Sequence, residues 1–261
     1  MARLHRSTLF HHALRISRAP QLASRALARL PITRHLAGGR LRYRLRSLEA
    51  FLVAEEIFRS EVYREAFAGR PIRTVVDLGC NVGYFTLYAA HRAGGEPLRA
   101  LAVDGNPAMV DETRWHVAVN HLDGVEVVHG VAGFAEGVPS VTFHINASNV
   151  ASSAHGTLNP NVPIKGDSRA EELPTVRVLD TWRRLHGERR IDLLKVDIEG
   201  SECDLFAHEP DLLAMTDRLV VEWHKWVTTI DEVDRALAPS GLVRCHVVGE
   251  DANAGVAIYQ R

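Results

Sequence analysis

The sequence predicts an α/β fold built on an open, doubly wound sheet whose strands are mostly parallel. From residue 72 onward, apolar strand patterns alternate with helical patterns, and this order gives a parallel sheet with helices on both faces. The strand segments are continuous apolar runs, as expected for strands that are buried on both faces. The segments LVRCHVVG and GVAIYQR flank the turn-rich EDANA, which predicts a closing hairpin with an antiparallel last strand.

The expected elements follow in chain order. Strands are expected at TVVDLG, LRALAVDGN, VEVVHGVAG, IDLLKVDIEG and RLVVEWH, with two short strands at 141–145 and 175–178. Helices are expected over residues 84–92, 109–120, 202–213 and 230–238. The stretch 134–173 is rich in Ser, Asn, Gly and Pro, so it is expected to be largely irregular.

The N-terminal part differs in composition from the rest of the chain. Residues 1–48 contain eleven of the 31 basic residues, all of them Arg, and none of the 32 acidic residues. Apolar residues between these arginines predict helical pieces over 3–37, and a second helical pattern covers 48–67. We therefore expect a basic helical extension over 1–70, in front of one globular domain over 71–261.

Several roles are open for this basic extension. It could be a solvated arm, a homodimer contact through its helices, a cap over the active site, or a recruiter of an anionic substrate. Nucleic-acid binding is the weaker interpretation, because only Phe10 and Tyr43 are available to stack on bases.

Cysteine usage and hydropathy indicate the cellular compartment. The three cysteines are far apart and show neither metal-binding nor disulfide spacing, which favours a reducing compartment. No apolar run reaches transmembrane length, and the N-terminus lacks a secretory apolar segment. A cytoplasmic protein is expected.

A glycine turn, DLGCNVG, follows the first strand of the sheet. Gly79 and Gly83 allow a tight turn beside a ligand, and Asn81 tolerates a left-handed backbone. The spacing is G-x-x-x-G, whereas dinucleotide-binding proteins show G-x-G-x-x-G. Asp77 suits an ammonium group or the N–H groups of the loop better than a pyrophosphate. The loop therefore favours a cationic, phosphate-free nucleoside such as S-adenosylmethionine.

The second strand ends in AVDGNP, which places Asp104 27 residues after Asp77 and Asn106 beside it. A carboxylate at this strand end can accept hydrogen bonds from both ribose hydroxyls of a nucleoside. Asp-Gly-Asn-Pro is also strong turn chemistry, so a turn or helix-cap role for Asp104 is the alternative. The preceding glycine turn favours ribose binding.

An ordered set of segments extends this pattern: VVDLGCNVGYFTL, VDGNP, WHVAVNHL, GVAG, and then VLDTW, IDLLKVDIEGSECDLF and VVEWH. The set resembles the FkbM family of S-adenosylmethionine-dependent methyltransferases over about residues 51–226. The family usually has Glu-Pro where this chain has Asp104-Gly105. The resemblance implies a Rossmann-like methyltransferase fold and methyl transfer, most often to a hydroxyl oxygen of a natural product or a sugar.

Methyl transfer to an alcohol needs a base or a metal to deal with the hydroxyl proton. Lys195, Asp197 and Glu199 alternate at the end of IDLLKVDIEG, so an extended strand would place them on one face. One interpretation is an internal ion pair of Lys195 with Asp197 or Glu199. The other has Asp197 facing the site as base or metal ligand, Lys195 setting its charge, and Glu199 contacting the substrate.

Glu222 and His224 alternate in the same way at the end of RLVVEWH. In one scheme, His224 takes the proton of the acceptor, since the pKa of histidine can lie near neutrality. In the other scheme Asp197 and Glu222, joined by His224, hold a divalent ion such as Mg²⁺ that binds the acceptor oxygen. The metal-free scheme is slightly preferred, because the sequence contains no denser acidic cluster.

The segment NASNVASSAHGTLNPN, residues 146–161, has many hydroxyl and amide groups and few apolar ones. Its composition is that of a solvated loop. Its place after the third strand also makes it a candidate substrate lid, in which Ser152, Ser153 and His155 would bind a polar acceptor.

The sequence is compatible with three functions. The favoured one is O-methylation of a small molecule, which could be carrier-bound or glycosylated. The second is an RNA or protein methyltransferase guided by the basic arm, although KVDIEG is not the Asn/Asp-Pro-Pro-Tyr/Phe site that amino-group methylation commonly uses. The third is a binding module without catalysis, which the intact loop and strand-end acids argue against.

Overall fold

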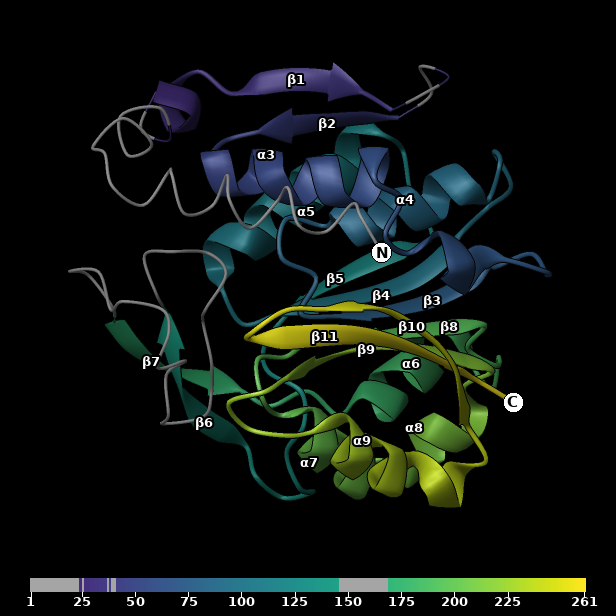
Figure 1. Ribbon diagram of the computed structural model, residues 1–261. Helices are drawn as coiled ribbons and strands as arrows, with labels where there is room; N and C mark the ends of the chain where they lie inside the picture. Colours follow the sequence, from purple (N-terminus) through teal and green to yellow (C-terminus); the bar gives the residue numbers. More distant parts are fainter. Residues whose placement is uncertain (1–23, 25, 37, 39–40, 146–168) are drawn as a thin grey trace. The chain divides into compact units, whose positions relative to one another are not determined.

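The computed structural model describes residues 24, 26–36, 38, 41–145 and 169–261 (Figure 1). The chain divides into two units, Met1–Glu61 and Val62–Arg261, each with its own secondary structure. Among the residues that the structure describes, no helix is long and apolar enough to cross a lipid bilayer.

In its described part, the first unit contains a hairpin and a short helix. The hairpin pairs β1 (Ile32–His35) with β2 (Arg42–Leu45), and α3 (Leu48–Ala54) follows, continued by a π-helical turn over Glu55–Arg59. The Ser47 side chain caps α3 by accepting a hydrogen bond from the N–H of Ala50. The rings of Tyr43 and Phe58 pack 4.8 Å apart, which ties the hairpin to the helical segment.

The helical pattern expected over 3–37 is wrong at residues 32–35, which form β1. Ile32 and Thr33 are β-branched and lie opposite Leu45 and Arg44, so the pairing of the two strands outweighs the helical spacing. The pattern over 48–67 is not one helix either, because the π-helical turn ends at Arg59 and a separate 3₁₀ turn begins at Arg64.

The second unit is built on a seven-stranded sheet in the order β10-β11-β9-β8-β3-β4-β5. Its strands are β3 (Thr74–Leu78), β4 (Arg99–Asp104), β5 (Val125–His129), β8 (Leu193–Val196), β9 (Arg218–His224), β10 (Val243–Glu250) and β11 (Ala254–Gln260). β11 is antiparallel to β9 and to β10, and the other paired strands of this sheet are parallel. The predicted doubly wound sheet with an antiparallel last strand is confirmed.

Helices cover both faces of this sheet (Figure 1). α4 (Tyr84–Arg92) and α5 (Pro107–Val119) lie on one face. The other face carries α6 (Val178–His186), α7 (Glu202–His208), α8 (Pro210–Met215) and α9 (Ile230–Leu237). A separate antiparallel pair, β6 (Ser140–Ile145) and β7 (Arg169–Pro174), follows β5 in the chain.

The core fixes the parallel strands so that their carboxyl ends share one edge of the sheet. All five residues of β3 are buried, and Leu78 packs in one cluster with Leu194 of β8, Trp182 of α6 and Leu205 of α7. Burying each of these large side chains contributes about 1.5–3 kcal/mol to the free energy of unfolding. The functional loops therefore start from a rigid base.

Several elements of the second unit differ from the sequence-based expectation, among them β7, which lies in a stretch expected to be irregular. The helix expected over 202–213 is two helices, because Glu209 leaves the helical conformation and Pro210 begins α8. The strand expected over 175–178 is not formed, since β7 ends at Pro174 and α6 begins at Val178. The sequence reasoning missed α6, although its buried residues Val178, Leu179 and Trp182 have helical spacing.

The end of β3 approaches the end of β8 more closely than any side chain would allow. Gly79 has φ +68°, and a Cβ atom added to it would lie 1.7 Å from the carbonyl oxygen of Asp197. The N–H of Asp197 also donates to the carbonyl oxygen of Leu78 at 3.2 Å. Glycine is thus required both by the backbone conformation and by the lack of space.

We expect Gly79→Ala to destabilise the chain by about 2–4 kcal/mol, the sum of left-handed backbone strain and overpacking. Gly94→Ala is the matched control, because Gly94 has φ +69° and nothing lies within 4 Å of its added Cβ. The control should lose only about 1 kcal/mol of stability, the cost of the backbone strain alone. Urea unfolding of both variants measures the difference, and equal losses would contradict the packing argument.

Candidate functional site

The order of the strands identifies the edge where a ligand is expected. From β3 the sheet continues in one direction through β4 and β5, and the chain then returns to place β8 and β9 on the other side of β3. Ligands of doubly wound sheets bind at the carboxyl ends of the strands beside such a switch point. Here it lies between β3 and β8.

The glycine turn after β3 has the conformation that its sequence predicts. Asn81 has φ +50°, the left-handed backbone expected of it, and Gly83 has φ +78°. A Cβ atom on Gly83 would lie 2.7 Å from Cγ2 of Thr113 in α5. The N–H groups of Gly79 and Cys80 both donate to the carbonyl oxygen of Val103, each at 3.0 Å. The turn is therefore anchored to the neighbouring strand β4.

Asp77 is completely buried beneath this turn. Its Oδ2 accepts a hydrogen bond from the Thr86 hydroxyl of α4 at 2.7 Å. Its Oδ1 lies 3.6 Å from Nζ of Lys195 and has no hydrogen-bond partner among the described residues. Burial raises the pKa of Asp77, and the charge of Lys195 opposes this rise.

Asp104 ends β4 and holds the turns on both sides of it. Its Oδ2 accepts from the N–H of Asn81 at 2.8 Å, and its Oδ1 accepts from the N–H of Asn106 at 2.7 Å. Asn106 in turn caps α5 by accepting from the N–H of Ala108. The turn-forming role of Asp104 is therefore present. Each carboxylate oxygen can accept one more hydrogen bond, so ribose binding stays a prediction.

Lys195 is buried at the switch point and holds β3 and β8 together. Its ammonium group donates to the carbonyl oxygen of Gly79 at 2.7 Å and lies 3.1 Å from Oδ2 of Asp197. Burial alone would lower the pKa of Lys195. The charges of Asp197 and Asp77 raise this pKa by more than burial lowers it, so the side chain stays charged. The internal pair of Lys195 with Asp197, one of the two sequence-based interpretations, is present.

A second group of polar side chains lies next to this pair. Asp197 and Glu199 follow β8, and His224 ends β9, and one ligand atom of each lies within 4.8 Å of the others. His224 Nε2 is 3.4 Å from Oε2 of Glu199 and 3.9 Å from Oδ1 of Asp197. Glu199 has φ +52°, a strained backbone for a glutamate. The sequence predicted Asp197 and His224 here, whereas Glu222 is not a member of this group.

Glu202, at the start of α7, orients the histidine. Its Oε1 lies 3.0 Å from Nδ1 of His224 and also accepts the N–H of Gly200 at 3.1 Å. Glu202 is completely buried, and its Oε2 has no hydrogen-bond partner among the described residues. The proton on Nδ1 is thereby assigned to the bond with Glu202, which turns Nε2 toward Asp197 and Glu199.

Burial and neighbouring charge shift two pKa values in this group. Burial raises the pKa of Glu199 to about 8, although His224 opposes the rise. Burial alone would lower the pKa of His224, but the hydrogen bond that it donates to Glu202 and the charge of Glu199 raise it to about 10.

Comparison with known proteins identifies the family of this chain. Residues 77–242 match the model of the methyltransferase FkbM domain, which is more than half of the chain. This chain belongs to the FkbM methyltransferase family. The resemblance stated from the sequence is confirmed, and with it the class of enzyme, a methyltransferase for which S-adenosylmethionine is the supported cofactor.

Relatives of this FkbM-family chain include Methyltransferase sdnD of Sordaria araneosa, 28% identical over 62% of this chain and 70% of that protein. The AMB antimetabolite synthetase AmbE of Pseudomonas aeruginosa is 28% identical over 76% of this chain, but this covers only 10% of the synthetase. The crystal structure of methyltransferase FkbM from Methylobacillus flagellatus superposes with a TM-score of 0.51 at 13% identity, over 77% of this chain and 47% of that one. This superposition supports the Rossmann-like methyltransferase fold.

Some site residues of the FkbM-family chain were missed by the sequence analysis, and others cannot be placed. Glu202 and Thr86 were not singled out, although Glu202 is three residues beyond Glu199 and opens the next helix. The three residues of the expected lid lie outside the described residues: Ser152, Ser153 and His155.

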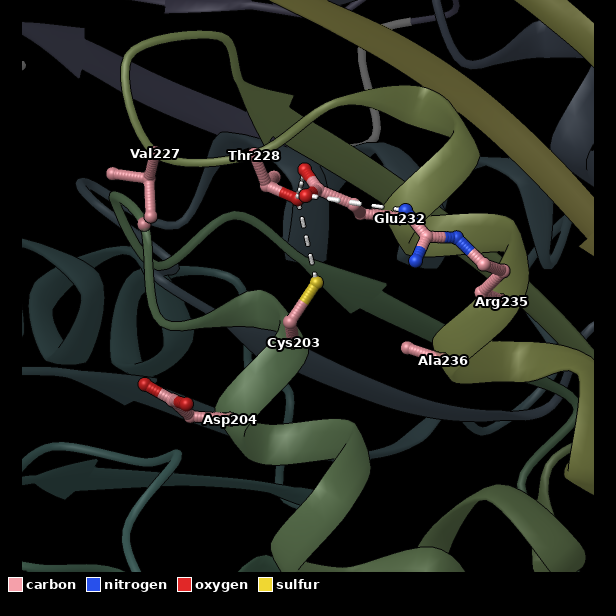
Figure 2. A pocket seen from close by; sticks show the side chains of 8 residues that line it. Cys203, Asp204, Val227, Thr228, Glu232, Arg235 and Ala236 are labelled. Atoms are coloured by element: carbon pink, nitrogen blue, oxygen red, sulfur yellow. Dashed lines mark hydrogen bonds and ion pairs between the residues drawn. The ribbon is translucent and has the colours of Figure 1, made fainter.

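A cavity of about 350 Å³ lies beside the group, between α7 and α9 (Figure 2). It is lined by Gly200, Cys203, Asp204, Val227, Thr228, Glu232, Arg235 and Ala236. Figure 2 shows Cys203 directed toward Thr228, with 3.5 Å between Sγ and Oγ1. Burial raises the pKa of the Cys203 thiol, so it is not an activated nucleophile. None of Asp197, Glu199 and His224 lines this cavity.

We expect Thr86→Val to destabilise the protein by about 1.5–3 kcal/mol, because it removes the hydroxyl that donates to a buried carboxyl group. Thr86→Ser keeps this hydroxyl and should lose about 1 kcal/mol, the cost of removing one buried methyl group. Chemical denaturation of the two variants compares these costs. A serine variant as unstable as the valine variant would show that the hydrogen bond to Asp77 contributes little.

Proposed function

We propose that this chain transfers a methyl group from S-adenosylmethionine to a hydroxyl oxygen of a small molecule, such as a natural product or a sugar. The observation that carries the proposal is the group of Asp197, Glu199 and His224 at the carboxyl ends of β8 and β9, one strand away from the glycine turn. The group can bind and activate an oxygen nucleophile. The match to AmbE covers only 10% of that protein. Its name, an antimetabolite synthetase, supports a small-molecule acceptor.

The cofactor is proposed to lie against the turn after β3 and the end of β4. When bound, S-adenosylmethionine supplies an electrophilic methyl carbon on a positively charged sulfur. The buried carboxyl group of Asp77 beneath the turn suits a cationic ligand: its Oδ1 makes no hydrogen bond among the described residues, although Lys195 lies 3.6 Å away. Gly79, Asn81 and Gly83 would form the turn around its methionine end, and Asp104 with Asn106 would bind its adenosine end.

The group at β8 and β9 is proposed to face the acceptor. As the new carbon–oxygen bond forms, the electron pair of the carbon–sulfur bond stays on sulfur, and the acceptor hydroxyl must lose its proton. His224 as the base is the first route. Despite burial, the hydrogen bond to Glu202 and the charge of Glu199 raise the pKa of His224 to about 10, which disfavours the neutral imidazole that this route needs. Both the metal-free and the metal-assisted route need Nε2 of His224 without its proton, so this pKa does not decide between them.

The proposal is tested with the full chain, by calorimetric titration with S-adenosylmethionine and by transfer of a labelled methyl group. Hydroxylated small molecules should be methylated, and the same molecules with the hydroxyl blocked should not. RNA and protein acceptors should take up no label. Transfer to RNA or protein alone would replace the small-molecule proposal, and a chain that binds no cofactor would leave only a non-catalytic role.

We expect the affinity for S-adenosylmethionine to rise between pH 5 and pH 7. Burial raises the pKa of Asp104 to about 6, so near pH 5 about nine-tenths of this carboxyl group is protonated. Only the ionised form accepts hydrogen bonds at both oxygens from ribose hydroxyls. Calorimetry should therefore give about tenfold weaker binding at pH 5 than at pH 7.

Asp104→Asn should weaken cofactor binding at pH 7 by about tenfold or more and remove most of this pH dependence. Asp111→Asn is the control, because Asp111 lies on the neighbouring helix α5 and its side chain is 79% exposed. An unchanged pH profile in Asp104→Asn would exclude Asp104 as the group that titrates.

A further inference from the structure

We propose that Asp197, Glu199 and His224 form a site for one divalent metal ion, and that Glu202 holds His224 in the ligating orientation. The ligand set differs from the one that the sequence suggested, with Glu199 in place of Glu222. The proposed role of the ion, binding the acceptor hydroxyl, rests on the proposed function. Binding of the ion itself does not.

Two of the three donor separations, those from His224, are close to the ones found around a shared ion, and all three donors lie within 4.8 Å of one another. A metal ion about 2.1 Å from each ligand, with angles of roughly 90–130° between them, separates the ligand atoms by about 3.0–3.8 Å. His224 Nε2 lies 3.4 Å from Oε2 of Glu199 and 3.9 Å from Oδ1 of Asp197. These separations are too long for strong hydrogen bonds and close to those that an ion requires.

His224 points a ligand nitrogen into the group. The side chain is 5% exposed, and Nε2 faces the carboxyl groups of Glu199 and Asp197. Its other nitrogen is held 3.0 Å from the buried carboxylate of Glu202. Metal-binding histidines usually donate their second N–H to a carboxylate or carbonyl, which fixes the tautomer and the ring orientation. Glu202 meets this requirement as a positioning residue.

The two oxygens of Asp197 face different cations. Oδ2 lies 3.1 Å from the ammonium group of Lys195, while Oδ1 is directed to the His224 side. Lys195 therefore fixes the carboxylate without occupying the oxygen that the ion would use. Glu199 reaches the group from a backbone with φ +52°, and Gly200 after it packs against Val227, which follows β9.

The balance of charge also favours a cation. Three carboxyl groups, those of Asp197, Glu199 and Glu202, surround His224, and Lys195 is paired with Asp197. Buried carboxylates at such separations are stabilised by a positive ion between them. Two carboxylate oxygens and one imidazole nitrogen suit Mn²⁺ or another borderline divalent ion, and leave positions for water and the acceptor oxygen.

In the reaction, an acceptor hydroxyl bound to the ion would lose its proton to solvent water more readily than the free alcohol. An electron pair on that oxygen would then form the bond to the methyl carbon, and the electron pair of the carbon–sulfur bond would remain on sulfur. This needs neither an oxidant nor a reductant.

Mn²⁺ is the probe, because its electron paramagnetic resonance signal falls when the ion binds a protein. The full chain, freed of metal and without cofactor or acceptor, should take up one Mn²⁺. Glu199→Gln and His224→Gln should each weaken this binding at least tenfold. Glu202→Gln should weaken it about tenfold or more, as loss of an orienting carboxylate does elsewhere.

Glu222→Gln is the matched control, since it neutralises a carboxylate on the same strand as His224 and should change Mn²⁺ affinity less than twofold. Circular dichroism of each variant separates loss of the ion from loss of the fold. Absence of Mn²⁺ binding, or binding that survives both Glu199→Gln and His224→Gln, would overturn the site. Titration with S-adenosylmethionine on the same metal-free sample keeps this outcome distinct from failure of the proposed function.

Discussion

The Lys195 ammonium is the interaction on which the architecture of the site depends. It donates to the backbone of Gly79, pairs with Asp197 and lies near Asp77, so one charge connects the cofactor turn to the strand end that faces the acceptor. A buried lysine without these partners would be costly. With them, its position is fixed by three groups at the ends of two strands. The glycine at position 79 is what lets these strand ends come close enough for one side chain to reach them all.

Glu202 and His224 form a second buried network of polar groups. Glu202 is out of contact with solvent, and its desolvation is offset by the N–H of Gly200 and by His224. It makes the position of the histidine depend on the first turn of α7 and not only on β9. The orientation of His224 is thus determined by two elements that the chain forms separately.

The sequence predicted the sheet well because continuous apolar runs and glycine turns are local signals. TVVDLG and RLVVEWH each became a strand, and Asn81 took the left-handed backbone expected of it. The hairpin in the first unit was missed because Ile32 and Thr33 satisfy a scattered helical pattern as easily as a short strand.

The candidate site was harder to predict than the fold. Alternation along a strand predicted that Lys195, Asp197 and His224 lie near one another, as they do, but it also favoured Glu222, which has the right spacing from His224. β8 ends at Val196, so Glu199 leaves the strand and turns toward His224 through a positive φ angle. Such a turn has no signature in the sequence, since glutamate rarely adopts it. The partner of His224, Glu202, lies on another element, and only the folded chain shows that the two meet.

The position of β11 links the site to the order in which the chain is synthesised. β9, which carries His224, lies between β8 and β11, and residues 254–260 of β11 pair with it from Arg218 to His224. The histidine strand therefore has a neighbour on only one side until residue 260 has left the ribosome. The glycine turn and Lys195 are made earlier, so the end of β9 with His224 reaches its final structure after them. During synthesis, the exposed edge of β9 must be protected from pairing with other strands.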